Sequence, residues 1–230
     1  MKKLISATLA ASLALSLAAC GSSASTDSVA ASSEAADMAA RPEWFHRHNR
    51  ERIPPDENFR ADRLLEDGET VKLGDTQIQC ALTPGHTPGT MSHFWTAHDR
   101  ERGPARIGIY GGAGFGTVRT AFLEEAGLPL SLQQAFEASI QKVWYRPVDL
   151  MLGNHPCHND TFSKWRRLQA GEQNPFWDPS EWQRFLGELR CSYRAFMALA
   201  PADQTALYER SRFCDYCGDR AARWFQRQGS

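Results

Sequence analysis

The 230-residue sequence has no segment rich in one sign of charge, no internal repeat and no apolar run that would span a bilayer comfortably. It carries 26 Lys and Arg residues against 27 Asp and Glu residues, with a formal net charge of −1. This balance excludes the basic surface on which nucleic-acid binding depends, so we expect no nucleic-acid partner. What the chain does have is 42% apolar residues, with 7 Trp and 12 Phe, and this composition predicts a packed globular domain.

The amino terminus has the pattern of a processing segment. Met1-Lys2-Lys3 is cationic, residues 4–17 are uncharged and rich in Ala, Leu and Ser, and the segment ends in Leu-Ala-Ala-Cys20. The length of the apolar stretch favours a cleaved signal peptide over residues 1–19. Its ending resembles the lipobox of bacterial lipoproteins, which implies a lipid attached to Cys20. Because Gly21 rather than Asp follows, the resemblance further implies a protein anchored in the cell envelope, at the outer membrane and facing the periplasm.

Residues 20–40 consist mainly of Ser, Ala, Asp and Glu, and we expect a tether without a core of its own. The remaining residues, 41–230, number about 190 and correspond to one domain.

Five cysteines remain besides Cys20, an odd number for a disulfide framework in an oxidising compartment. Cys214 and Cys217 have the C-x-x-C spacing that disulfides, metal knuckles and redox motifs share. These three interpretations stay open on the sequence.

The hydrophobic pattern predicts an α/β protein. Residues 41–62 resemble a helix followed by a loop. Alternation of apolar and polar residues, or a short apolar run, predicts strands at 70–73, 76–83, 90–97, 106–110 and 148–152. Helical spacing predicts helices over 130–145, 159–168 and 180–200, and a final helical region from Pro201.

Two Gly/Pro-framed loops follow predicted strands and carry histidines. The first is Thr83-Pro-Gly-His86-Thr-Pro-Gly89, and the second is Gly153-Asn-His155-Pro156. Such loops hold imidazoles at the rim of a sheet, where they bind a metal or stay as ordinary surface histidines.

These two loops, in this order, resemble the later histidine segments of the metallo-β-lactamase superfamily. The absence of Asp from residues 110–115 is similar to the lactamase-like branch, whose second zinc has Asp, His and His ligands. The resemblance implies the carboxy-terminal half of an αβ/βα sandwich with a helical tail. It also implies zinc as cofactor, with His86 as the third ligand of the first ion and His155 as the last ligand of the second. In that family a hydroxide between the metals attacks a carbonyl.

The chain departs from the family in lacking the His-x-His-x-Asp-His motif that supplies the other four ligands. His46 and His48 form a His-x-His pair, but Arg50 and Glu51 stand where Asp and His would follow. The segment resembles a helix, on which residues two apart point in different directions. His158 either joins His155 as a ligand or caps the helix that begins at Asn159. His93 and His98 have no second signal and are expected to be structural.

We therefore expect a zinc-dependent hydrolase of the metallo-β-lactamase superfamily that cleaves an ester, amide or lactam in a small-molecule substrate. The missing motif predicts impaired activity. The alternative is a non-catalytic envelope lipoprotein that binds a partner or ligand. Strands with large residues on both faces predict an exposed apolar patch or sheet edge where the other half of the sandwich would lie. Pairing with a second copy, a real deletion and a shortened gene model would each account for the missing half.

Overall fold

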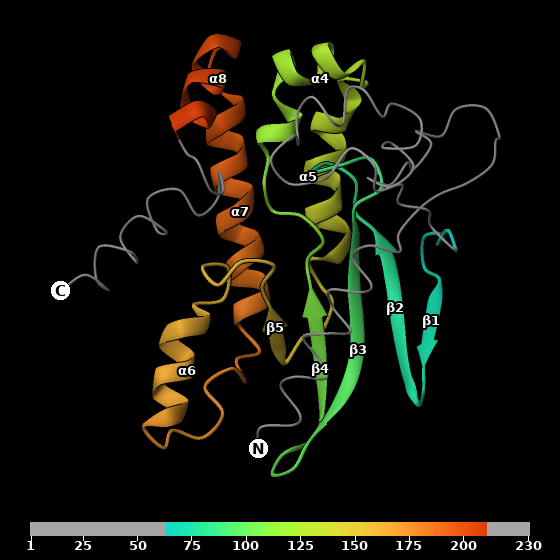
Figure 1. Cartoon of the computed structure of the whole chain (residues 1–230), viewed down its shortest axis with the longest axis vertical. Helices are drawn as coiled ribbons and strands as arrows, with labels where there is room; N and C mark the ends of the chain where they lie inside the picture. The colour runs from blue at the N-terminus through green and yellow to red at the C-terminus, as the bar shows by residue number, and fades with distance from the viewer. Residues whose placement is uncertain (1–62, 211–230) are drawn as a thin grey trace, which may run out of the picture.

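A five-stranded sheet organises the domain in a computed structural model of the chain, which describes residues 63–210 (Figure 1). The strand order is β1-β2-β3-β4-β5. Their bounds are β1 Thr70–Leu73, β2 Thr76–Leu82, β3 Met91–Asp99, β4 Gly103–Ile109 and β5 Leu150–Leu152. The predicted helix at 41–62, the signal peptide and the tether all lie outside the described residues.

The directions of the strands decide which loops can meet. β1, β2, β3 and β4 pair antiparallel in sequence order, while β5 returns to pair parallel with β4. Consequently β2, β4 and β5 run in the same direction, and the loops that follow these three strands leave from the same end of the sheet (Figure 1). Both histidine-bearing loops are among them.

The crossover from β4 to β5 contains a 3-10 turn, η1, and two helices. η1 covers Gly116–Val118, α4 covers Thr120–Ala126 and α5 covers Ser131–Val143. After β5 come α6 Thr161–Gln169, α7 Glu181–Met197 and α8 Pro201–Arg210. None of the helices in residues 63–210 is long and apolar enough to cross a membrane.

One face of the sheet packs against α5 and α7. Phe94 of β3 meets Trp182 of α7 edge to face, with ring centroids 5.4 Å apart. Trp182 also donates from its indole nitrogen to the carbonyl of Val143, at 2.9 Å. Phe136 of α5 stacks on Tyr193 of α7, with ring centroids 4.5 Å apart. These buried rings fix the two helices against the strands that carry the histidine loops.

The opposite face of the sheet carries a separate apolar cluster that includes Leu65, Ile78, Cys80 and Met91. No described helix contributes to this cluster, yet Ile78 and Met91 are each only 4% exposed. Ile107 on the same face is 6% exposed. These three side chains are buried, and the exposed apolar patch or sheet edge expected where the other half of the sandwich would lie stays a prediction.

The predicted elements agree with the structure in type and nearly in extent. All five strands and the helices over 130–145, 159–168, 180–200 and from Pro201 are present, so the α/β class is confirmed. The short helix α4 was not predicted. Ser180 occupies the N-cap position of α7, but its side chain makes no capping hydrogen bond. It bonds instead to Asp178 and Arg184.

Candidate metal centre

The site lies where three loops leave the same end of the sheet. Residues 83–90 follow β2, residues 110–115 follow β4 and residues 153–160 follow β5. The first and third are the two predicted histidine loops, and the second is the glycine-rich segment between them. Their meeting confirms the placement that the sequence pattern indicated.

The first histidine loop is closed at its base. The backbone nitrogen of Thr83 donates to the carbonyl of Thr90 at 2.7 Å, and the Thr83 hydroxyl lies 2.9 Å from that of Ser92. Gly85 has a φ of +146°, and a Cβ built there would lie 2.5 Å from the Phe136 ring. A side chain at Gly85 would be both strained and obstructed, so glycine is required for the approach to α5.

His86 is held by contacts to the glycine-rich loop and to η1. Its Nδ1 lies 2.7 Å from the carbonyl oxygen of Gly114, and the Thr117 hydroxyl donates to the His86 carbonyl at 2.6 Å. The imidazole rests on Gly112, where an added Cβ would lie 2.5 Å from the His86 Cβ. A carbonyl partner at Nδ1 leaves Nε2 for another ligand, which is the usual arrangement of a zinc-binding histidine.

Asn154 joins the second histidine loop to the glycine-rich loop. Its side-chain amide donates to the carbonyls of Tyr110 and Gly111, at 2.8 and 2.6 Å. Gly111 in turn donates from its backbone nitrogen to the Ser92 hydroxyl at 3.1 Å. One hydrogen-bonded chain thus connects the two histidine loops through the glycine-rich loop.

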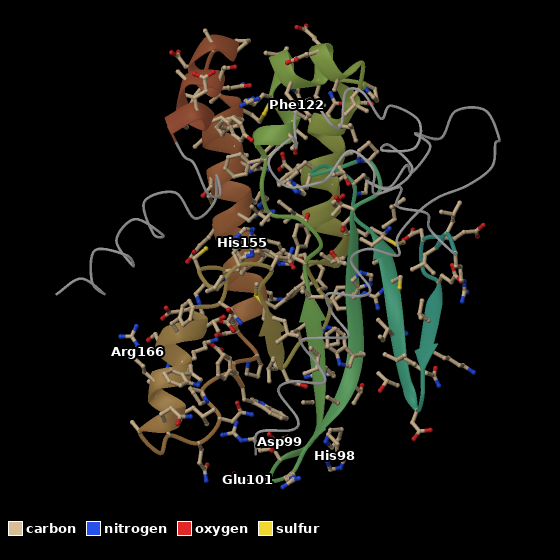
Figure 2. The ribbon with its side chains drawn as sticks, in the orientation of Figure 1. His98, Asp99, Glu101, Phe122, His155 and Arg166 are labelled. Atoms are coloured by element: carbon tan, nitrogen blue, oxygen red, sulfur yellow. The ribbon has the colours of Figure 1, made fainter. Side chains whose placement is uncertain are left out.

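His155 and His158 are neighbours on the second loop, with ring centroids 5.1 Å apart (Figure 2 labels His155). His158 is buried against Phe185 of α7, at 5.4 Å between ring centroids. Desolvation, and then the charges of His155 and His86, lower the pKa of His158 to about 3. Desolvation, and then the charge of His86, lower the pKa of His155. Both shifts favour the neutral imidazole, and the charge of His86 contributes to each.

The donor set fits part of a zinc site. Within residues 63–210 no group of three or more His, Cys, Asp and Glu side chains is arranged to hold a metal ion. His86 and His155 are thus brought together, whereas His158 does not complete a triad with them. Because zinc takes three or four protein ligands, the described residues are at least one ligand short. His46 and His48 lie outside the described residues.

The predicted capping role of His158 is wrong. Asp160, in the left-handed conformation at φ 51°, is the N-cap of α6, and no side chain caps the helix. His158 is instead buried under Phe185. The covering helix, α7, begins over twenty residues later in the chain.

His93 and His98 both lie on β3 and belong to none of the three loops. His93 is buried on β3, where burial lowers its pKa to about 4, and its Nδ1 has no hydrogen-bond partner among the residues that the structure describes. His98 lies at the far end of β3 from the His155 loop (Figure 2). Its Nδ1 is 2.9 Å from the Asp99 carbonyl.

Among the cysteines of the described residues, Cys157 lies on the second histidine loop. Cys80 and Cys191 are free thiols, and Cys157 is disulfide-bonded. Cys20, Cys214 and Cys217 lie outside the described residues, so lipid attachment and the three interpretations of the C-x-x-C pair stay predictions.

Two features of this region were not predicted from the sequence. One is the set of supporting residues Gly112, Gly114 and Thr117, for which the only signal was the glycine-rich composition of residues 111–116. The other is a cavity of about 540 Å³ between α6, α7 and the loop that joins them, with His158 in its wall. Its charged walls include the ion pairs Lys164–Glu181 and Arg184–Asp178, and neither His86 nor His155 lines it.

Comparison with known proteins finds sequences similar to parts of this chain. A probable metallo-hydrolase of Burkholderia pseudomallei (strain 1710b) is 35% identical over 103 residues, which are 43% of this chain and 32% of that protein. An acyl-coenzyme A thioesterase of Gallus gallus is 39% identical over 61 residues, which are 26% of this chain and 19% of that protein. No family model matches the sequence.

Among solved structures the domain is similar to BJP-1, a subclass B3 metallo-β-lactamase of Bradyrhizobium japonicum. The TM-score is 0.55 at 26% sequence identity, over 65% of this chain and 54% of that one. The chain therefore spans about half the length of the solved structure and about a third of the length of the bacterial relative. The predicted partial sandwich is confirmed as the fold class.

Proposed function

Because the chain belongs to the metallo-β-lactamase superfamily, we propose that its two histidine loops form part of a zinc-dependent hydrolytic site. The observation that carries the proposal is the meeting of His86 and His155 at one rim of the sheet, joined through the glycine-rich loop. The proposed substrate is a small molecule with an ester, amide or lactam group.

The described residues would bind and orient. His86 would offer Nε2 while the Gly114 carbonyl fixes the direction of its ring, and His155 would approach from the β5 side. Asn154 and Gly112 hold the two loops in register by a pair of hydrogen bonds and a close contact. A zinc ion bound there would polarise the scissile carbonyl and lower the pKa of a water molecule.

A complete site needs ligands beyond the described residues. We infer that a second copy of this chain, or the other half of the family fold, would supply them, and that the isolated chain is weakly active. A site shared between copies makes zinc content depend on protein concentration, since the ion would then bind the dimer alone.

Zinc content tests the proposal directly. We expect the full chain, dialysed against micromolar zinc and measured by inductively coupled plasma mass spectrometry, to retain less than one ion per chain. His86→Ala and His155→Ala should each abolish that zinc, whereas the matched control His98→Ala should leave it unchanged because His98 lies at the opposite end of β3. Equal zinc in His86→Ala and the parent chain would contradict the proposal.

A second candidate is a non-catalytic envelope lipoprotein that binds a partner or ligand. It is favoured by the absence of a third metal ligand beside His86 and His155 in the described part of the chain. The two functions differ in zinc stoichiometry. A binding protein would hold no zinc at any protein concentration, and would keep its fold and its partner after treatment with a chelator.

For location, we propose a lipid on Cys20 that anchors the protein in the cell envelope, facing the periplasm from the outer membrane. The support is the Leu-Ala-Ala-Cys20 ending of the leader. In a bacterial host, the chain should incorporate labelled fatty acid and sediment with membranes. Cys20→Ser should lose the label, and a labelled Cys20→Ser product would refute attachment at that residue.

A further inference from the structure

The disulfide bond of Cys157 joins the described domain to a cysteine outside it. The sequence has 6 cysteines, three of which lie within residues 63–210. Of these three, Cys80 and Cys191 are free thiols, whereas Cys157 is disulfide-bonded. The partner of Cys157 is therefore one of the three cysteines beyond the described range, namely Cys20, Cys214 and Cys217.

The last described helix carries the chain back to the histidine loops. The Arg119 guanidinium lies over the Tyr208 ring of α8, with Cζ 3.8 Å from the ring centroid. Arg119 directly follows η1, from which Thr117 donates to the His86 carbonyl. Because α8 ends at Arg210, the chain leaves the described domain beside η1, and thus beside the support of the first histidine loop.

The C-terminal Cys-x-x-Cys pair follows closely after α8. Cys214 is 4 residues and Cys217 is 7 residues beyond Arg210. Fully extended segments of these lengths reach roughly 14 and 24 Å. Cys157 belongs to the second histidine loop, which Asn154 joins to the glycine-rich loop that leads into η1. The pair is thus attached to the domain on the side where the second histidine loop lies.

Cys20 is the less suitable partner. In the proposed lipoprotein its sulfur carries the lipid as a thioether, and a sulfur alkylated in this way cannot form a disulfide. This step rests on the proposed lipid attachment. We propose that Cys157 is disulfide-bonded to one cysteine of the Cys214-x-x-Cys217 pair, which fastens the C-terminal segment to the second histidine loop.

The bond acts on the loop that carries His155. Cys157 stands two residues after His155 and directly before His158, so a covalent link at its sulfur limits the movement of both imidazoles. In the proposed periplasmic location, an oxidising compartment, a disulfide is the expected state of two cysteines that meet. A link that closes a loop of about 60 residues also restricts the unfolded chain strongly.

The pairing leaves the other cysteine of the C-terminal pair as a spare thiol, three residues from the bonded one. The thiolate of this spare cysteine can attack the sulfur of the bonded one. A new S–S bond then joins Cys214 to Cys217, the bond to Cys157 breaks, and the Cys157 sulfur leaves as a thiolate that takes up a proton. One disulfide is exchanged for another, so the step needs no oxidant or reductant. The second histidine loop thereby has a fastened and a released state.

Peptide mapping of the full chain tests the pairing without any substitution. The protein is produced in the oxidising envelope of a bacterial host, quenched in acid, alkylated under denaturing conditions without reductant, and digested for mass spectrometry. We expect the main disulfide to join the Cys157 peptide to the peptide that contains Cys214 and Cys217. A Cys157 peptide that is alkylated throughout, or that is linked to any other cysteine, would overturn the proposal.

The exchange is tested by incubation at pH 8, where thiolate forms, before the acid quench. We expect part of the parent chain to carry a Cys214–Cys217 disulfide together with an alkylated Cys157. Removal of the spare cysteine, by Cys217→Ser or, if Cys217 is the partner, by Cys214→Ser, should lower the amount of alkylated Cys157 by about tenfold or more. Cys191→Ser is the matched control, since Cys191 is a free, exposed thiol on α7, and it should leave the exchange unchanged. Equal alkylation of Cys157 in the parent and in the variant without the spare cysteine would overturn the exchange.

The lipid anchor and the disulfide fail in different ways. A disulfide between Cys157 and Cys20 would remove both. An unmodified Cys20 thiol, found together with the link from Cys157 to the C-terminal pair, would refute the lipid alone. A lipid on Cys20, found together with a free Cys157 thiol, would refute the disulfide alone. The mapping needs no metal, so its result is also independent of the proposed zinc site.

Discussion

The two histidine loops are supported differently, although they meet at the same rim. His86 is fixed by its own neighbours: the Gly114 carbonyl at Nδ1, the Thr117 hydroxyl at its carbonyl, and Gly112 beneath the ring. His155 has no hydrogen bond of this kind among the described contacts. Its loop is held instead by its neighbours: by the amides of Asn154 and Asn159, the second of which donates to the Met151 carbonyl at 3.0 Å, by the disulfide bond of Cys157 and by the burial of His158. The first loop is thus preorganised for a ligand, while the second depends on the contacts of its neighbours.

This difference bears on function because zinc affinity depends on the supporting residues as much as on the ligands. A preformed His86 would bind with little loss of side-chain entropy, whereas His155 would be ordered partly by the ion itself. A second copy or a further half domain that covers the rim would therefore order the second loop more than the first. The predictions below change each support in turn.

The largest effect is expected from Gly111→Ala, because Gly111 connects both loops. A Cβ at this position would lie 2.1 Å from the backbone carbonyl oxygen of Met91, which cannot move without disturbing β3. We expect a loss of about 3 kcal/mol in the free energy of unfolding, the upper part of the range for overpacking. Urea denaturation followed by circular dichroism measures it.

Gly187→Ala serves as the control for that substitution. Gly187 lies inside α7, and an added Cβ would make an ordinary contact at 3.5 Å with Trp144. Alanine there should stabilise the helix by about 0.5–1 kcal/mol. Equal destabilisation by Gly111→Ala and Gly187→Ala would mean that the close approach of Gly111 to Met91 does not matter for stability.

Acid should loosen the second loop. Burial lowers the pKa of His158 to about 3, against 6.5 for an unperturbed histidine. The unfolded chain therefore binds the proton more readily than the folded chain. This contribution to stability is complete above pH 6.5 and is lost progressively as the pH falls toward 3.

Over that window the loss should amount to a few kcal/mol, since one pKa unit corresponds to about 1.4 kcal/mol. His158→Gln should flatten the profile of unfolding free energy between pH 6.5 and 4, while His98→Gln should not. His93, whose pKa burial lowers to about 4, contributes a similar slope from the other face of the sheet. An unchanged profile in His158→Gln would show that His158 is not desolvated as described.

Asn154→Leu should affect the two loops differently, and its effect on stability should be intermediate. It removes the donors to the Tyr110 and Gly111 carbonyls and leaves both acceptors without that partner. We expect about 1–3 kcal/mol of destabilisation, and weaker zinc binding through His155 in particular. Crystal structures or histidine NMR shifts would check whether His155 moves while His86 stays in place. Movement of both histidines would show that Asn154 supports the two loops alike.

The sequence predicted the elements better than their contacts. Alternation identified the strands because alternate residues of a strand point into a core. Ile78 and Phe94 do so on opposite faces of the sheet. The Gly/Pro loops identified His86 and His155. The helix α4 was missed because its 7 residues, Thr120–Ala126, are too few to establish a helical period beside Gly127 and Pro129.

Contacts between distant segments could not be read from local pattern. Thr117 supports His86 from 31 residues away, and Lys164 is buried only because Glu181, 17 residues later, accepts its charge. The helix at α6 was predicted, but its orientation was not, since residue spacing does not tell which side faces the domain. For the same reason the sequence left His158 open between a metal ligand and a helix cap.

The smallest effect is expected from Thr117→Val, which tests the first loop alone. The change keeps the shape of the side chain and removes the hydroxyl that donates to the His86 carbonyl at 2.6 Å. It should cost about 1 kcal/mol of stability, the usual net value of one hydrogen bond. Because Gly114 still fixes Nδ1 and Gly112 still supports the ring, zinc binding should weaken less than in Asn154→Leu. Parallel zinc titrations of the two variants decide the matter. A larger loss of affinity in Thr117→Val would mean that His86, not His155, is the weakly supported histidine, and the ranking of the two loops would be reversed.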